Sequence, residues 1–219
     1  MWTAAGRDPA EPLPLLVVHD GPEYAEYSLL LQLLESATAE LEIPPLRAAL
    51  LPPPFPRDEH YSASAHYARA LALDLLPALR RRAPSHGSAP VGLGASLGAL
   101  ALLHAHRVQP GAFGGLLLQS GSFFRLRSDR QEAGFARFGR IARFVGSVLR
   151  APGWPDPIPV GMTCGTGEEN LANNRVVRDA LARQGYAAEL DEHPDAHNWV
   201  SWRDSLHGPL VSLLQRLWG

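Results

Sequence analysis

The apolar residues of this chain alternate between two patterns along its length. Short continuous apolar runs are typical of buried strands, and they lie at residues 13–18, 47–51, 90–93, 114–119, 158–164 and 187–192. Longer stretches with helical spacing of apolar residues predict helices at residues 24–40, 65–82, 99–104, 131–149, 168–184 and 200–218. Because strands and helices alternate, we expect an α/β fold with a mostly parallel central sheet, flanked by helices on both faces as a three-layer sandwich.

The composition narrows the class of protein. With 219 residues, of which 46% are hydrophobic, the chain can bury a full core, and we expect one domain over residues 1–219. A formal net charge of -2 gives no field that would gather nucleic acid or an anionic membrane. No apolar run approaches the ~20 residues that span a bilayer, and the first residues do not resemble a signal peptide. We therefore expect a cytoplasmic protein, and its oligomeric state stays open.

Residue types exclude further chemistry. The single cysteine, Cys164, excludes an intrachain disulfide and a cysteine-rich zinc site. All basic residues are arginine, so a lysine Schiff base is excluded as well. The sequence implies no metal and no organic cofactor.

Residues 94–98 form the most informative stretch of the chain. Ser96 lies between Gly94 and Gly98, after a predicted strand and before a predicted helix. A sharp strand-to-helix turn strains the backbone of the serine, and glycines two residues away on each side remove Cβ atoms that would otherwise collide. This setting predicts that Ser96 is a nucleophile.

A serine hydroxyl needs a base to take its proton, and nine histidines compete for that role. His197 follows the last predicted strand and precedes the closing helix, which is where an α/β-hydrolase places its histidine in the chain order serine, acid, histidine. We predict His197 as the base, with His193 as the rival. Three others are interpreted as packing, solvent-facing or loop residues: His19, His104 and His106.

The acid that orients the histidine should follow the penultimate strand. Glu168 and Glu169 both stand there, and a carboxylate at this point would hold the imidazole in one tautomer. We choose Glu168. Acidic residues are also favoured in the first turn of a helix for electrostatic reasons alone, so Glu169 and a purely structural role remain alternatives.

An oxyanion hole needs two backbone N–H groups. One should come from Leu97, directly after the nucleophile. The second should come from the turn after the first predicted strand, where Pro22 has no N–H to donate. We predict Gly21 as this donor, with Glu23 as the alternative.

Substrate contacts are expected from loops at the same edge of the sheet. Arg57, Arg125 and Arg127 could receive an anionic group by bidentate contacts, and solvated surface arginines are the competing interpretation. Phe123 and Phe124 are candidates for lining the acyl pocket, the alternative being that they pack under the following loop.

Taken together, these segments resemble the enterochelin-esterase-like branch of the α/β-hydrolases related to esterase D. Arg57-Asp58-Glu59 is similar to the Arg-x-Glu loop of that family. The other matching segments are residues 15–21, 94–100, 118–124, 165–170 and 197–203. The resemblance covers residues 13–214 in order and implies an α/β-hydrolase fold with Ser96, Glu168 and His197 as the triad. Pro22, and Pro194-Asp195-Ala196 before the histidine, depart from the family pattern.

We therefore expect a serine esterase that hydrolyses a carboxylic ester of a small molecule through an acyl-enzyme on Ser96. Two alternatives stay open. The same triad could pass the acyl group to an alcohol, which would make the protein an acyltransferase. The chain could also be a catalytically inactive α/β-hydrolase-fold binding module.

Overall fold

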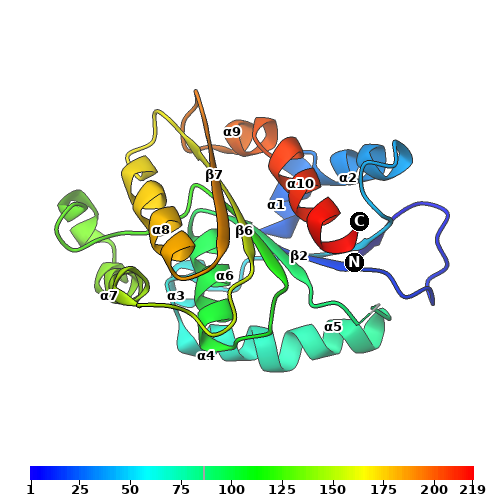
Figure 1. Ribbon diagram of the computed structural model, residues 1–219, viewed down its shortest axis with the longest axis horizontal. Helices are drawn as coiled ribbons and strands as arrows, with labels where there is room; N and C mark the ends of the chain where they lie inside the picture. Colours follow the sequence, from blue (N-terminus) through cyan, green and yellow to red (C-terminus); the bar gives the residue numbers. More distant parts are fainter. Residues whose placement is uncertain (86) are drawn as a thin grey trace.

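The computed structural model describes residues 1–85 and 87–219. Within these residues, one sheet runs in the order β1-β3-β2-β4-β5-β6-β7, and every neighbouring pair is parallel except β1 with β3 (Figure 1). The strands are β1 (Trp2–Thr3), β2 (Leu15–His19), β3 (Arg47–Leu51), β4 (Val91–Ala95), β5 (Gly115–Gln119), β6 (Pro159–Gly165) and β7 (Ala187–His193). This topology is that of an α/β-hydrolase fold, as the sequence predicted.

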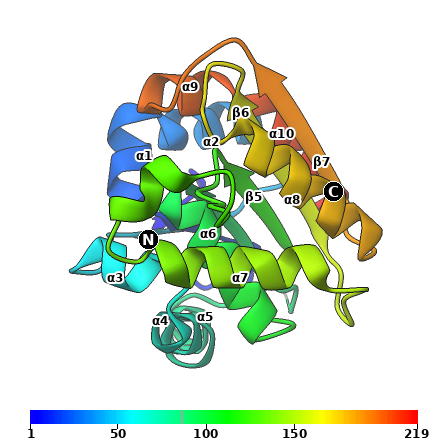
Figure 2. The ribbon, with the colours of Figure 1, turned by 90° about the vertical axis from the view of Figure 1, so that its left-hand side faces the viewer.

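Helices cover both faces of the sheet, as Figures 1 and 2 show, with α4 and α5 on one side and α9 and α10 on the other. The α-helices are α1 (Gly21–Tyr27), α2 (Leu30–Ala39), α3 (Arg57–Tyr61), α4 (Ala65–Arg69), α5 (Leu76–Arg82), α6 (Leu97–Val108), α7 (Phe138–Arg150), α8 (Leu171–Arg183), α9 (Trp199–Asp204) and α10 (His207–Trp218). A π-helical segment, η1 (Ala70–Leu75), joins α4 to α5, and a 3-10 turn, η2 (Arg130–Gly134), precedes α7. Two apolar cores result. One lies under α3 to α8, and the other lies under α1, α2, α9 and α10.

The predicted strands are confirmed with boundaries shifted by at most two residues, and three of the predicted helices are interrupted. The helix predicted at 24–40 breaks where Leu29 adopts a left-handed conformation with φ 51°. The helix predicted at 131–149 breaks at an extended Phe135, and the closing helix breaks between Asp204 and His207. Apolar spacing continues across each break, so periodicity alone does not reveal where the backbone turns.

Within residues 1–85 and 87–219, no helix is long and apolar enough to cross a membrane.

Helix α6 lies deep in the molecule and buries both of its histidines, in agreement with the packing interpretation. His104 lies edge-on to Phe144, and His106 pairs with the hydroxyl of Tyr186 at 3.0 Å. His19, at the end of β2, is fully buried too. Burial lowers the pKa of each of these three imidazoles to about 4.

The turn between β4 and α6 depends on two glycines. A Cβ atom on Gly94 would lie 2.9 Å from the carbonyl carbon of Gly98, closer than atoms pack in proteins. The first turn of α6 can therefore lie directly against the end of β4, and the sharp turn at Ser96 is possible only with this close approach.

The first prediction concerns that approach. Gly94→Ala should destabilise the protein by about 1–3 kcal/mol, because the backbone of Gly98 has to move away. Gly139→Ala is the matched control, since nothing lies within 4 Å of its added Cβ, and alanine inside a helix should stabilise by up to about 1 kcal/mol. Urea unfolding measures both changes. A Gly94→Ala protein as stable as the wild type would contradict the packing argument.

The second prediction follows from the buried histidines. Since their folded pKa is about 4 against an ordinary 6.5, the unfolded chain binds more protons between these two pH values. Stability should thus fall as the pH is lowered from 6.5 to 4. His104→Leu removes one of these groups, so its free energy of unfolding should decline less steeply with falling pH. Urea unfolding across this range tests the point, and an unchanged slope would refute it.

Candidate active site

The residues predicted from the sequence meet at the carboxyl edge of the sheet, where ligands bind in open parallel α/β folds. Ser96 follows β4, Glu168 follows β6, and His197 follows β7. Three neighbouring regions of the sheet edge therefore deliver one side chain each.

Ser96 occupies the tight turn between β4 and α6. Its backbone has φ 55° and ψ -121°, which a residue with a side chain adopts only under constraint. Its N–H donates to the carbonyl of Gln119 at 2.8 Å, and its own carbonyl accepts from the N–H groups of Leu100 and Ser122. Bonds to β5 and α6 thus hold the strained residue in place.

The three side chains form a continuous hydrogen-bonded line. His197 Nε2 lies 3.0 Å from Ser96 Oγ, and His197 Nδ1 lies 2.7 Å from Glu168 Oε2. A carboxylate can only accept, so Nδ1–H donates to Glu168 and leaves Nε2 of a neutral imidazole free to accept the Ser96 proton. The indole of Trp202 lies edge-on to the imidazole, with ring centroids 5.1 Å apart.

Glu168 is a buried carboxylate, and its hydrogen-bond donors keep it charged. Burial by itself raises the pKa of its carboxyl group, but hydrogen bonds from His197, from the Ser120 hydroxyl at 2.6 Å and from the Gly165 N–H at 2.8 Å outweigh it. The pKa of Glu168 is consequently held below its usual value. The side chain is 1% exposed, so its partners are fixed.

The two rival residues take no part in this hydrogen-bonded line. Glu169 is exposed and does not contact His197 among the hydrogen bonds of the described residues. His193 Nε2 pairs with the hydroxyl of Ser201 at 2.8 Å. The sequence distinguished these glutamates and histidines only by their positions in the chain. In the structure, Glu168 and His197 are the pair that contact each other.

Sequence reasoning missed a group of supporting side chains. Ser120, besides donating to Glu168, accepts a hydrogen bond from Trp202 Nε1 at 2.9 Å. Ser122 Oγ lies 3.0 Å from Ser96 Oγ, and the Asn170 amide donates to the Ser120 carbonyl. The signal was present, since Ser120 and Ser122 follow β5, directly beside the nucleophile strand.

The two predicted oxyanion donors begin helices. Leu97 is the first residue of α6, and Gly21 is the first residue of α1. N–H groups in the first turn of a helix have no acceptor within that helix, which leaves those of Leu97 and Gly21 free of intrahelical bonds. Pro22 occupies the second position of α1, where the missing N–H costs no helical hydrogen bond.

Two cavities adjoin Ser96. The Phe124 cavity, of about 450 Å³, is lined by Ser96, Ser122, Phe124, Glu132, Gly167, Glu168, Glu169, Asn170, Ala196 and His197. The Trp199 cavity, of about 340 Å³, is lined by Asp20, Glu23, Pro53, Arg57, Ala95, Ser96, Trp199 and Trp202. An ester bound at Ser96 therefore has room on both sides of its carbonyl group.

The five predicted substrate contacts occupy different positions, and Arg127 lines the same cavity as Arg125. Phe124 lines the Phe124 cavity, whereas Phe123 is fully buried in the core. Arg57 lines the Trp199 cavity, with Nε and Nη2 bound to the two carboxylate oxygens of Asp20 at 3.0 and 2.8 Å. Arg125 lines a separate cavity between the loop after β5 and α7, and its Nε donates to Asn173.

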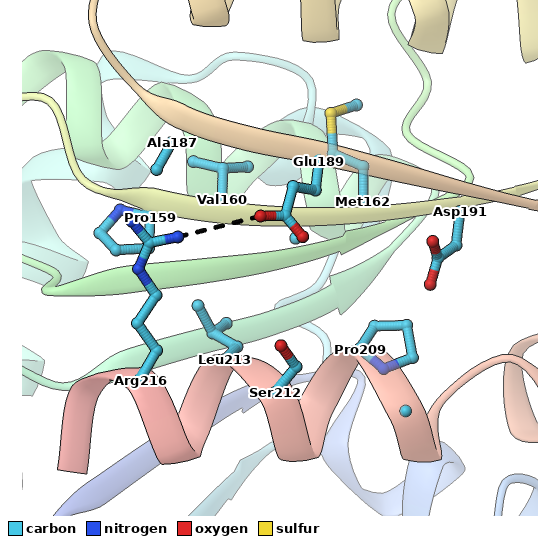
Figure 3. A pocket seen from close by; sticks show the side chains of 12 residues that line it. Pro159, Val160, Met162, Ala187, Glu189, Asp191, Pro209, Ser212, Leu213 and Arg216 are labelled. Carbon is cyan, nitrogen blue, oxygen red and sulfur yellow. Dashed lines mark ion pairs between the residues drawn. The ribbon is translucent and has the colours of Figure 1, made fainter. Parts of the chain in front are cut away.

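A further hollow lies away from Ser96, between α10 and strands β6 and β7 (Figure 3). Helix α10 leaves part of β7 uncovered there. Glu189 of β7 faces Arg216 of α10 at 3.9 Å, and Asp191 extends the acidic character of the strand. Among the residues that the structure describes, no group of three histidine, cysteine or acidic side chains is arranged to hold a metal ion.

Comparison with known proteins places this geometry in context. No family model matches the chain. It is 27% identical over 215 residues to an iron(III) enterobactin esterase of Dickeya dadantii, covering 94% of this chain and 49% of that protein. The enterochelin esterase of Shigella flexneri has a similar structure, with a TM-score of 0.83 at 23% identity, over 100% of this chain and 54% of that one. In sequence the chain thus resembles an enterobactin esterase, and it shares the α/β-hydrolase fold.

The same fold occurs in more distant structures. A ferulic acid esterase matches with a TM-score of 0.70 at 14% identity, over 95% of this chain and 87% of that one. The siderophore hydrolase EstB of Aspergillus nidulans matches with a TM-score of 0.68 at 16% identity, over 99% and 89%. The chain spans about half the length of the enterobactin esterases that it matches. The resemblance expected from the sequence is confirmed.

Proposed function

We propose that this protein is a serine esterase that hydrolyses a carboxylic ester of a small molecule. The observation that carries the proposal is the hydrogen-bonded line from Ser96 through His197 to Glu168, assembled from three separate strand ends. Independent support comes from the relatives, which are named as esterases.

Acylation begins when Ser96 Oγ attacks the ester carbonyl carbon while His197 Nε2 takes the hydroxyl proton. Glu168 stabilises the imidazolium that forms, because its carboxylate lies 2.7 Å from Nδ1. The N–H groups of Leu97 and Gly21 bind the negative oxygen of the tetrahedral intermediate. His197 then gives the proton to the departing alcohol, and Ser96 is left as an acyl ester.

Deacylation repeats these steps with water as the nucleophile. His197 takes a proton from water, the hydroxide attacks the acyl carbonyl, and the proton returns to Ser96 as the carboxylic acid leaves. Ser120 keeps Glu168 charged and oriented throughout. When Ser96 donates to His197, Ser122 is the donor in its contact with Ser96, so a second hydroxyl steadies the nucleophile.

Active-site labelling with a fluorophosphonate tests this assignment. The wild type should be labelled on Ser96, and Ser96→Ala should not react. Turnover of a short 4-nitrophenyl ester should fall roughly 10⁶-fold in Ser96→Ala or His197→Ala and roughly 10⁴-fold in Glu168→Ala, by analogy with dissected serine hydrolases.

Ser147→Ala and His207→Ala are the controls, because both residues are exposed and lie on α7 and α10 away from the triad. They should keep full activity. Equal labelling of wild type and Ser96→Ala would overturn the proposal. Added alcohols that divert the product from acid to a new ester would reassign the reaction as acyl transfer.

A further inference from the structure

The side chains around Ser96 carry an excess of negative charge. The Phe124 cavity is lined by Glu132, Glu168 and Glu169 and by no arginine among the described residues. Glu168 is engaged by His197, Ser120 and Gly165. Glu132 and Glu169 form no ion pair within residues 1–85 and 87–219. Two carboxylates that form no ion pair in the described part of the chain therefore line this cavity.

The Trp199 cavity does not compensate them. Arg57 supplies the one guanidinium along the two cavities in the described chain, and its Nε and Nη2 atoms are both bound to the carboxylate of Asp20. Glu23 lines the same cavity, and its Oε2 atom is buried without a hydrogen-bond partner in the described residues. A buried carboxylate oxygen without a donor is costly, and a donor on a bound ligand would satisfy it.

Three arginines that form no ion pair among the described residues line a different cavity. Arg125, Arg127 and Arg150 line the neighbouring cavity beside α7, which does not include Ser96 or His197. These three guanidinium groups therefore do not line either of the two cavities that adjoin Ser96. An anionic group beside the reacting carbonyl would face Glu132 and Glu169, and the guanidinium of Arg57 is already engaged by Asp20.

The Phe124 cavity also offers an aromatic wall. The ring of Phe124 stacks on Phe138 with centroids 6.1 Å apart and contacts Phe135 edge-on at 6.2 Å, so it is held in place. Aromatic rings beside carboxylates form a favourable environment for alkylammonium groups, which are attracted by both and are cheaper to desolvate than small inorganic cations.

We propose that the preferred substrate is an ester bearing a cationic ammonium group, which binds in the Phe124 cavity beside Glu132 and Glu169. This inference rests on the esterase activity proposed above and defines its substrate class. It also separates this chain from any relative that takes a polyanionic ester, because such a substrate would meet uncompensated carboxylates on both sides of Ser96.

Two matched series of esters test the charge preference. In the first, 4-nitrophenyl esters carry acyl chains of equal length that end in a trimethylammonium, a tert-butyl or a carboxylate group. In the second, acetate esters carry the same three groups on the alcohol. Trimethylammonium and tert-butyl have nearly the same shape, so the comparison isolates charge. We expect kcat/KM to fall about tenfold at each step from ammonium to tert-butyl to carboxylate in at least one series.

Substitution then assigns the effect to the cavity. The double variant Glu132→Gln and Glu169→Gln keeps the side-chain shapes and removes both charges, so the order among the three esters should collapse. Glu189→Gln, in the hollow beside α10 shown in Figure 3, removes the charge of an exposed carboxylate that lines neither cavity at Ser96 and should retain the order. High salt should weaken the preference of the wild type.

The outcomes separate the two proposals. If Ser96-dependent turnover is present but the carboxylate esters react as fast as the ammonium esters in both series, the charge inference fails and the esterase assignment stands. Persistence of the order in the double variant would also overturn the inference. If no ester is turned over, the esterase assignment fails. Calorimetry with the Ser96→Ala protein then still decides the charge question, since the ammonium ester should bind more tightly than its tert-butyl counterpart.

Discussion

The close contact between Gly94 and Gly98 is the constraint on which the rest of the site depends. It lets α6 begin directly at the end of β4 and leaves Ser96 between them with a positive φ. The strain is balanced by bonds on both sides, since the Ser96 N–H donates to β5 and its carbonyl accepts from α6 and from Ser122. The hydroxyl is therefore presented at a fixed point beyond the sheet, where the residues of the other strand ends can reach it.

Glu168 connects the remaining parts of this arrangement. It accepts hydrogen bonds from the end of β6, from Ser120 after β5 and from His197 after β7. A buried carboxylate is stable only with such donors, so the same bonds that hold its charge also fix the loops that carry them. Trp202 closes the network from α9, by donating to Ser120 and packing against His197. One set of contacts thus stabilises the Glu168 carboxylate, holds the loops and orients the imidazole of His197.

The shared fold does not by itself determine the substrate, which is expected to depend on the side chains that line the cavities. The α/β-hydrolase scaffold occurs in enterobactin esterases and in a ferulic acid esterase, and a scaffold of this kind supports many reactions. In this chain, individual side chains set the charge around Ser96. Asp20 neutralises the guanidinium of Arg57 there, whereas Glu132 and Glu169 remain without partners among the described residues. Substrate choice is expected to follow these side chains rather than the topology.

Local sequence determined the strands and indicated two of the three main candidate site residues, Ser96 and His197. Apolar runs must be buried, and a serine between two glycines after such a run suits few structures besides the nucleophile turn, so Ser96, and then His197 by chain order, could be predicted. Tertiary structure alone decided between Glu168 and Glu169, since the two are adjacent and only packing shows which one turns toward His197. It also paired Arg57 with Asp20 and buried Phe123 while leaving Phe124 at the cavity. These outcomes depend on distances between segments far apart in the chain, and no local pattern of residues encodes such distances.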